Sequence, residues 1–98
     1  MTLLETYKPM REYIIKYLNS KISFYSDIAI FNRLHRIEIH INCYSSNRPF
    51  KYFRQRLYEL KVNFIIEPSR GFEDEYIVLK EDEYLKLYTL LKLRGDIN

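Results

Sequence analysis

The sequence predicts an α+β fold in which helices cover one face of an antiparallel four-stranded sheet, in the order helix-strand-strand-helix-strand-strand-helix. Apolar residues recur at helical spacing in three segments, and they alternate with polar residues in the segments between them. A turn of sequence Pro68-Ser69-Arg70-Gly71 joins two of the predicted strands. With 98 residues, the chain is expected to form a single domain over residues 1–98 that needs no disulfide.

The first helix is expected to begin at Thr2 or at Thr6. Thr2 and Glu5 have the spacing of a capping box, in which hydroxyl and carboxylate satisfy each other's backbone donors. The choice of start decides the role of Pro9. If the helix begins at Thr2, Pro9 is interior and should kink it, whereas a start at Thr6 leaves Pro9 in the first turn, where it is harmless.

Two strands are expected next. Over residues 22–32 the alternation of apolar residues favours a strand from Ile22 to Phe31, although Ser26 and Asp27 could instead cap a short helix. The following strand runs from Arg36 to Tyr44 and has the pattern of a half-buried antiparallel strand. Its apolar side carries Ile37, Ile39, Ile41 and Cys43, and its polar side carries Arg36, Glu38, His40 and Asn42.

A helix from Arg48 to Lys61 is the clearest element. Asn47 is its expected N-cap, and Pro49 falls in the first turn, where a missing N–H costs nothing. The apolar stripe consists of Phe50, Phe53, Leu57 and Leu60. The opposite face is cationic and carries two tyrosines; its members are Arg48, Lys51, Tyr52, Gln55 and Glu59, flanked by Arg54, Arg56 and Tyr58.

A hairpin and a last helix complete the domain. The hairpin strands are expected over residues 62–67 and 76–79, with Arg70 at the tip of the turn. Three acidic residues open the last helix over 81–83, and it ends before Gly95. Its core stripe is Tyr84, Leu87, Tyr88 and Leu91. Because Leu85, Leu90 and Leu93 point elsewhere, a second burial surface is expected, and a homodimer would supply it most simply.

Composition excludes several classes of protein. The single cysteine, Cys43, allows no intramolecular disulfide, and it indicates a reducing, cytoplasmic setting. We expect no signal peptide and no membrane span, because no apolar run exceeds four residues. The only two imidazoles, His35 and His40, lack a third ligand at a suitable spacing, so we expect no metal site, no cofactor and no enzymatic activity.

Charge is unevenly distributed along the chain. Residues 33–61 contain seven basic and two acidic side chains, a net charge of +5, whereas residues 67–83 contain two basic and seven acidic ones, a net charge of −5. Such polarity can steer a partner or complement a second copy of the chain. The basic part coincides with the helix that begins at Arg48.

The segment from Arg48 to Lys80, a basic helix followed by two strands, resembles the recognition helix and wing of winged-helix proteins. This resemblance implies binding to double-stranded DNA. It places Arg48, Lys51, Gln55 and Arg56 at the groove and Arg70 on a phosphate. A strand stands where those proteins have the preceding helix. The full element order is also similar to the repeat of LAGLIDADG endonucleases, but residues 16–19 carry no acidic metal ligand, so no catalytic residue is carried over.

A protein–protein interaction module is the competing hypothesis. Ten tyrosines are present, and tyrosine often contributes interface energy. The predicted interface residues are Tyr52, Leu85, Leu90 and Leu93. Small size, polarised charge and a composition typical of an AT-rich genome fit a viral or mobile-element protein that inhibits a host defence complex in the host cytoplasm.

Overall fold

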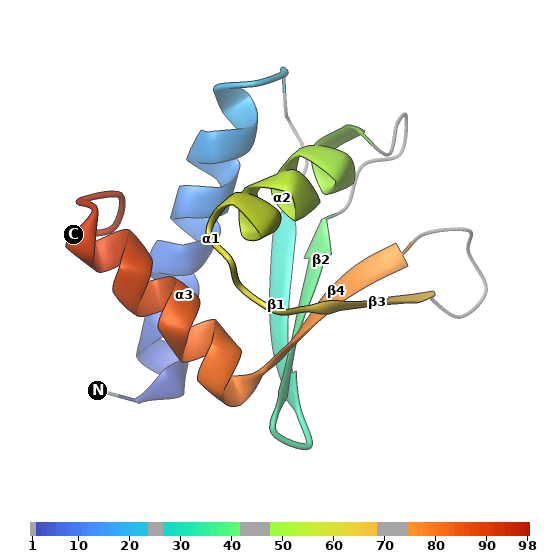
Figure 1. Cartoon of the computed structure of the whole chain (residues 1–98), viewed down its shortest axis with the longest axis vertical. Coiled ribbons are helices and arrows are strands. Elements are labelled where there is room, and N and C mark those ends of the chain that lie inside the picture. The colour runs from blue at the N-terminus through green and yellow to red at the C-terminus, as the bar shows by residue number, and fades with distance from the viewer. Residues whose placement is uncertain (1, 24–26, 42–47, 69–74) are drawn as a thin grey trace.

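The computed structural model describes residues 2–23, 27–41, 48–68 and 75–98. It confirms the predicted α+β order of helices and strands (Figure 1). The elements are α1 (Leu3–Asn19), β1 (Ile28–Arg33), β2 (Arg36–Ile41), α2 (Arg48–Glu59), β3 (Ile65–Pro68), β4 (Glu75–Lys80) and α3 (Glu81–Leu93).

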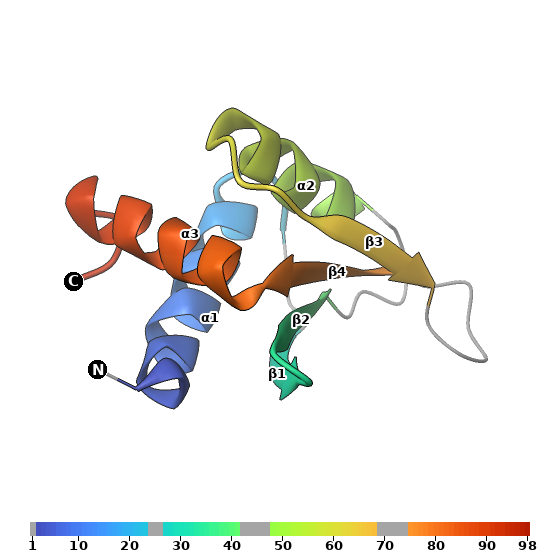
Figure 2. The ribbon, with the colours of Figure 1, turned by 60° about the horizontal axis from the view of Figure 1, so that its bottom comes forward.

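The four strands form one sheet in the order β1-β2-β4-β3, with antiparallel pairing throughout. In the central pair, Ile37 lies opposite Leu79 and Ile39 lies opposite Ile77, and all four side chains are completely buried. The three helices lie on this side of the sheet (Figure 2). The prediction of helices on one face is therefore confirmed.

Each helix buries an apolar stripe in a common core. The predicted stripes of α2 and α3 are buried in full. From α1, the core receives Met10, Tyr13, Ile14 and Leu18. Between α1 and α3, Thr6 and Tyr84 are both completely buried, and their hydroxyl oxygens lie 2.7 Å apart in a hydrogen bond. Burial raises the pKa of Tyr84, so this hydroxyl stays protonated.

The structure decides two alternatives in the first half of the chain. Residues 28–33 are a strand, which begins later than predicted. At its start, the Asp27 carboxylate accepts a hydrogen bond of 2.8 Å from the Ile28 N–H. Helix α1 begins at Leu3 with Thr2 as N-cap, and Pro9 is therefore interior. The Thr2 side chain makes no capping hydrogen bond, so the predicted capping box is wrong. Asn47 lies outside the described residues.

Helix α2 ends in a Schellman motif, and this motif explains why β3 is shorter than predicted. The Val62 N–H donates to the Leu57 carbonyl at 3.1 Å, and the Lys61 N–H donates to the Tyr58 carbonyl at 3.1 Å. The motif turns Val62 into the core, and the strand starts only at Ile65. Lys61 takes the left-handed conformation, with φ of 57°, at the position where α3 has Gly95.

Replacing Lys61 with glycine should stabilise the protein by about 0.5–1 kcal/mol, because a side chain in the left-handed region costs more than the added flexibility of glycine in the unfolded state. Urea unfolding measures the change. Gln55→Gly, at an exposed position inside α2, is the control and should lower stability by about 1 kcal/mol. Destabilisation by both variants would contradict this account of the α2 terminus.

Candidate nucleic-acid interface

The polar face of α2 gathers most of the residues predicted to bind nucleic acid. Because α2 buries Phe50 and Phe53 against the core, Arg48, Lys51 and Gln55 are exposed. Tyr52 is half-buried beside them. The four residues line one shallow depression of about 380 Å³: Arg48, Lys51, Tyr52 and Gln55.

This depression is suited to an anion. Of the four described residues that line it, two are cationic and none is acidic. No acidic residue occupies the first turn of α2, so Arg48 and Lys51 lie near the positive end of the helix dipole without a carboxylate beside them on that turn. Cations are unfavourable at this end of a helix, whereas a bound phosphate is favourable.

Arg56, predicted to belong to the same contact set, has another role in the structure. Its Nε donates to the Tyr13 hydroxyl at 3.0 Å, and its Nη1 lies 3.2 Å from a Glu59 carboxylate oxygen. The guanidinium also lies over the Tyr17 ring, 5.5 Å from the centroid, and only 17% of the side chain is exposed. Arg56 joins α2 to α1 through its Nε, and its Nη1 is bonded within α2.

Arg70 lies outside the described residues, so its prediction remains without a structural placement. The strands that precede and follow it in the sequence, β3 and β4, are both present. Strands β3 and β4 pair in antiparallel register from Ile65 opposite Val78 to Pro68 opposite Glu75.

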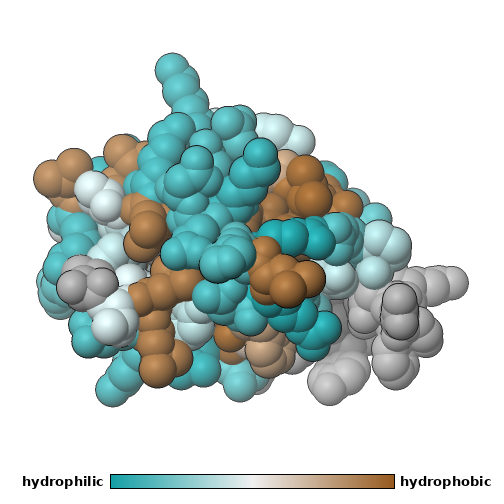
Figure 3. Space-filling view, turned by 90° about the horizontal axis from the view of Figure 1, so that it is seen from below, coloured by the Kyte–Doolittle hydropathy of each residue, from teal (hydrophilic) through white to brown (hydrophobic). Residues whose placement is uncertain are grey.

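The leucines predicted to form an interface on α3 differ in exposure. Leu93 is 80% exposed and Leu85 is 41% exposed, whereas Leu90 is half-buried against the core. On the side of the molecule seen in Figure 3, hydrophobic side chains appear as several small groups separated by hydrophilic ones. Such scattered groups are ordinary for a protein surface, so the geometry at α3 favours an interface only around Leu93 and Leu85.

The two histidines lie at different places in the sheet, each beside one carboxylate. His35 is exposed at the turn between β1 and β2, 3.5 Å from a Glu81 carboxylate oxygen. His40 lies on the outer side of the sheet, 3.0 Å from a Glu38 carboxylate oxygen. Among the described ranges, no group of three His, Cys, Asp or Glu side chains could hold a metal ion. Cys43 is outside these ranges.

A second set of side chains, on the outer side of the sheet, was not grouped by sequence reasoning. It includes Phe31 from β1, His40 from β2 and Tyr76 from β4. The alternation within each strand predicts which side chains share a side, but it does not reveal that β4 lies next to β2. The missing information was the strand order.

Comparison with family models, with curated proteins and with solved structures gave no match for this chain. Within the part of the chain that the structure describes, no helix has the length and apolar character to cross a membrane.

Replacing Arg56 with alanine should destabilise the protein by about 1–2 kcal/mol, because it leaves the hydroxyl of the buried Tyr13 without its charged donor and removes the contact with Tyr17. Thermal and urea unfolding measure the loss. Arg54→Ala removes the same charge from the same helix, where the guanidinium lies over the Phe50 ring, and should cost less than about 1 kcal/mol. Equal costs would contradict the role assigned to Arg56.

Proposed function

We propose that this protein is a non-enzymatic nucleic-acid-binding protein that contacts double-stranded DNA through the exposed face of α2. The observation that carries the proposal is the convergence of Arg48, Lys51, Tyr52 and Gln55, two of them cationic, on one depression at the exposed face of α2. The proposal places the protein in the cytoplasm, or in the host cytoplasm if the chain is viral.

The side chains of the depression divide into positioning and recognition roles. Arg48 and Lys51 would contact phosphates, which fixes the position of the helix but carries no sequence information. Gln55, one turn further along the same face, has the amide that can pair with an adenine edge in the major groove. Helix α2 would enter that groove with its N-terminal half. Arg70 would add a phosphate contact, and Arg56 is left out because its side chain is only 17% exposed and already bonds to Tyr13 and Glu59.

Replacing Arg48 and Lys51 together with glutamine should weaken duplex binding by about tenfold or more, because two phosphate contacts are lost. The slope of log K against log salt should become less steep by about 1.8, or about 0.9 for each contact. Fluorescence anisotropy with a random-sequence duplex, titrated at several salt concentrations, measures both quantities.

The matched control is Arg11→Gln with Lys8→Gln, which removes one arginine and one lysine from the exposed side of α1. This variant should bind the duplex as the wild type does. If the two double variants weaken binding equally, only net charge matters and the α2 site is refuted. Failure of the wild type to bind at low salt would remove the proposed function altogether.

A protein partner is the second candidate, and the exposed leucines of α3 favour it. Leu93 and Leu85 would pack against a second copy of the chain, or against a host complex if the protein is a viral inhibitor. A two-fold dimer would use the same patch twice.

Sedimentation velocity at micromolar concentration should give a dimer that Leu93→Glu dissociates, since a charge would then be buried at the interface. Leu34→Glu is the control, because Leu34 is 92% exposed at the turn between β1 and β2. This control should leave the dimer intact. A wild-type monomer at all concentrations would refute self-association through α3.

A further inference from the structure

The side of the sheet opposite the helices carries an ordered set of side chains that the α2 proposal does not use. We call it the outer sheet face. Its members follow from the strand register, because residues directly opposite one another lie on the same side of a sheet. They are Ala29, Phe31 and Arg33 of β1, Arg36, Glu38 and His40 of β2, Tyr76, Val78 and Lys80 of β4, and Ile65 and Glu67 of β3.

Three cations form a row across this face. Arg33 lies opposite Arg36, and Arg36 lies opposite Lys80, on three adjacent strands. Like charges directly opposite one another destabilise a sheet. Arg36 reaches the Glu67 carboxylate, but in the described part of the chain neither Arg33 nor Lys80 forms an ion pair. The row therefore lacks two counter-charges, which an anionic partner would supply.

Apolar and aromatic side chains adjoin the cation row. Phe31 is 45% exposed and Ile65 is 55% exposed, at the two ends of the neighbouring row. The Phe31 ring meets the His40 ring edge to face at 5.3 Å, and His40 stacks on Tyr76 at 4.3 Å. The guanidinium of Arg33 lies 6.0 Å from the centre of the Phe31 ring. Cations and rings are thus interleaved on one surface.

Both carboxylates of the outer sheet face are already engaged. Glu38 is only 7% exposed and bonds to His40 at 3.0 Å. Glu67 accepts a hydrogen bond of 2.9 Å from the Tyr76 hydroxyl and pairs with Arg36. These two donors hold the pKa of Glu67 below its ordinary value, so it is ionised at neutral pH and internally neutralised. Among the described strand residues of this face, the charges without a counter-charge are those of Arg33 and Lys80.

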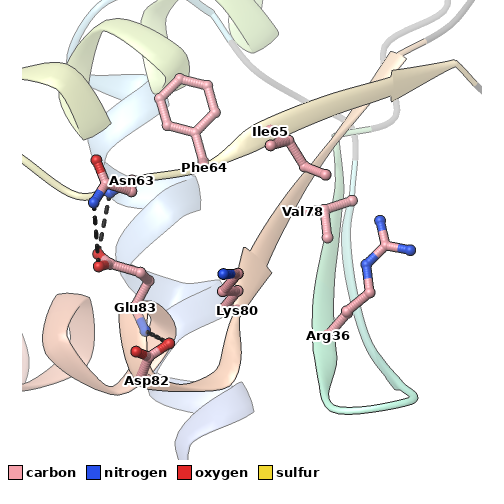
Figure 4. Close-up of a pocket in the computed structure, with 8 residues that line it drawn as sticks. All are labelled: Arg36, Asn63, Phe64, Ile65, Val78, Lys80, Asp82 and Glu83. Atoms are coloured by element: carbon pink, nitrogen blue, oxygen red, sulfur yellow. Dashed lines mark hydrogen bonds between the residues drawn. The ribbon is translucent and has the colours of Figure 1, made fainter.

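A hollow of about 310 Å³ lies at the end of the cation row (Figure 4). It exists because β3 begins only at Ile65, so no strand residue stands beside Lys80. Its apolar walls are Phe64, Ile65 and Val78, its cations are Arg36 and Lys80, and its remaining lining is Asn63, Asp82 and Glu83. Hydrogen bonds of 3.1 and 3.4 Å from the Asn63 backbone and side chain to the Glu83 carboxylate close its far side.

We infer that the outer sheet face binds single-stranded nucleic acid. Phosphates lie along the cation row, one base stacks on Phe31, and the hollow beside Lys80 receives another. Single-stranded nucleic acid combines a negative phosphate backbone with flat, unstacked bases. Stacking on exposed aromatic side chains is available only to bases released from a duplex. This site is independent of the duplex site on α2, because the helices lie on the other side of the sheet.

The test is fluorescence anisotropy with a labelled oligothymidylate of about 15 nucleotides, within the usual site size of such surfaces. Arg33→Gln with Lys80→Gln should weaken binding about tenfold or more and make the salt slope less steep by about 1.4, or about 0.7 for each phosphate contact. The melting temperature should not fall, because the change relieves repulsion within the cation row. Arg11→Gln with Lys8→Gln is again the charge-matched control and should bind normally.

A second variant separates stacking from charge. Phe31→Ala should weaken binding of the oligonucleotide about tenfold while leaving the salt slope unchanged, because it removes a stacking platform and no cation. Leu4→Ala, at an apolar residue that is 75% exposed on α1, is the control and should have no effect.

Three results would overturn the inference. The first is a wild type that does not bind the oligonucleotide at low salt, and the second is equal weakening of binding by Arg33→Gln with Lys80→Gln and by Arg11→Gln with Lys8→Gln. The third is polyglutamate competing as effectively as the oligonucleotide while Phe31→Ala leaves binding unchanged. The last result would assign the face to an acidic protein segment. Loss of duplex binding on changing Arg48 and Lys51 tests the α2 site alone, so the two proposals can fail separately.

Discussion

The pairing of β2 with β4 is the constraint on which the rest of the structure depends. It sets Ile37 opposite Leu79 and Ile39 opposite Ile77, and these four buried side chains form the sheet's floor in one core cluster with the apolar stripes of the three helices. Because side chains alternate along a strand, the same register places Arg36, Glu38 and His40 on the outer sheet face. A slip of one residue would bury charge and expose the floor, so the core and the outer sheet face are specified together.

The structure also shows that basic side chains in a sequence do not all contribute to a surface. Arg56 and Lys51 lie in the same helix and carry the same charge, yet Arg56 donates inward to Tyr13 while Lys51 is exposed. The difference is one of angle around the helix: Arg56 lies on the flank that meets α1. A cation on a flank can donate to the hydroxyl of a buried tyrosine, and its long side chain covers apolar surface at the same time.

The helices could be predicted from the sequence because their apolar periodicity is strong and Gly95 gives a clear end to α3. The end of α2 could not be predicted, because Lys61 adopts a conformation that is usual for glycine, and no local sequence pattern indicates it.

The α2 depression could be predicted residue by residue, because all its residues belong to one helix. The outer sheet face could not, because it is assembled from four strands whose neighbours are decided by packing. Non-local pairing of this kind leaves no periodic trace in the chain.

Both proposed sites share one electrostatic property, which links stability to binding. On α2, cations occupy the positive end of a helix, and on the outer sheet face they stand opposite one another. Each placement raises the energy of the isolated chain. Neither is needed for the core, because the floor and the three apolar stripes are formed by other residues. An anion bound at either site would lower this energy, so each proposal predicts that charge which is unfavourable in the free protein contributes favourable free energy to the complex.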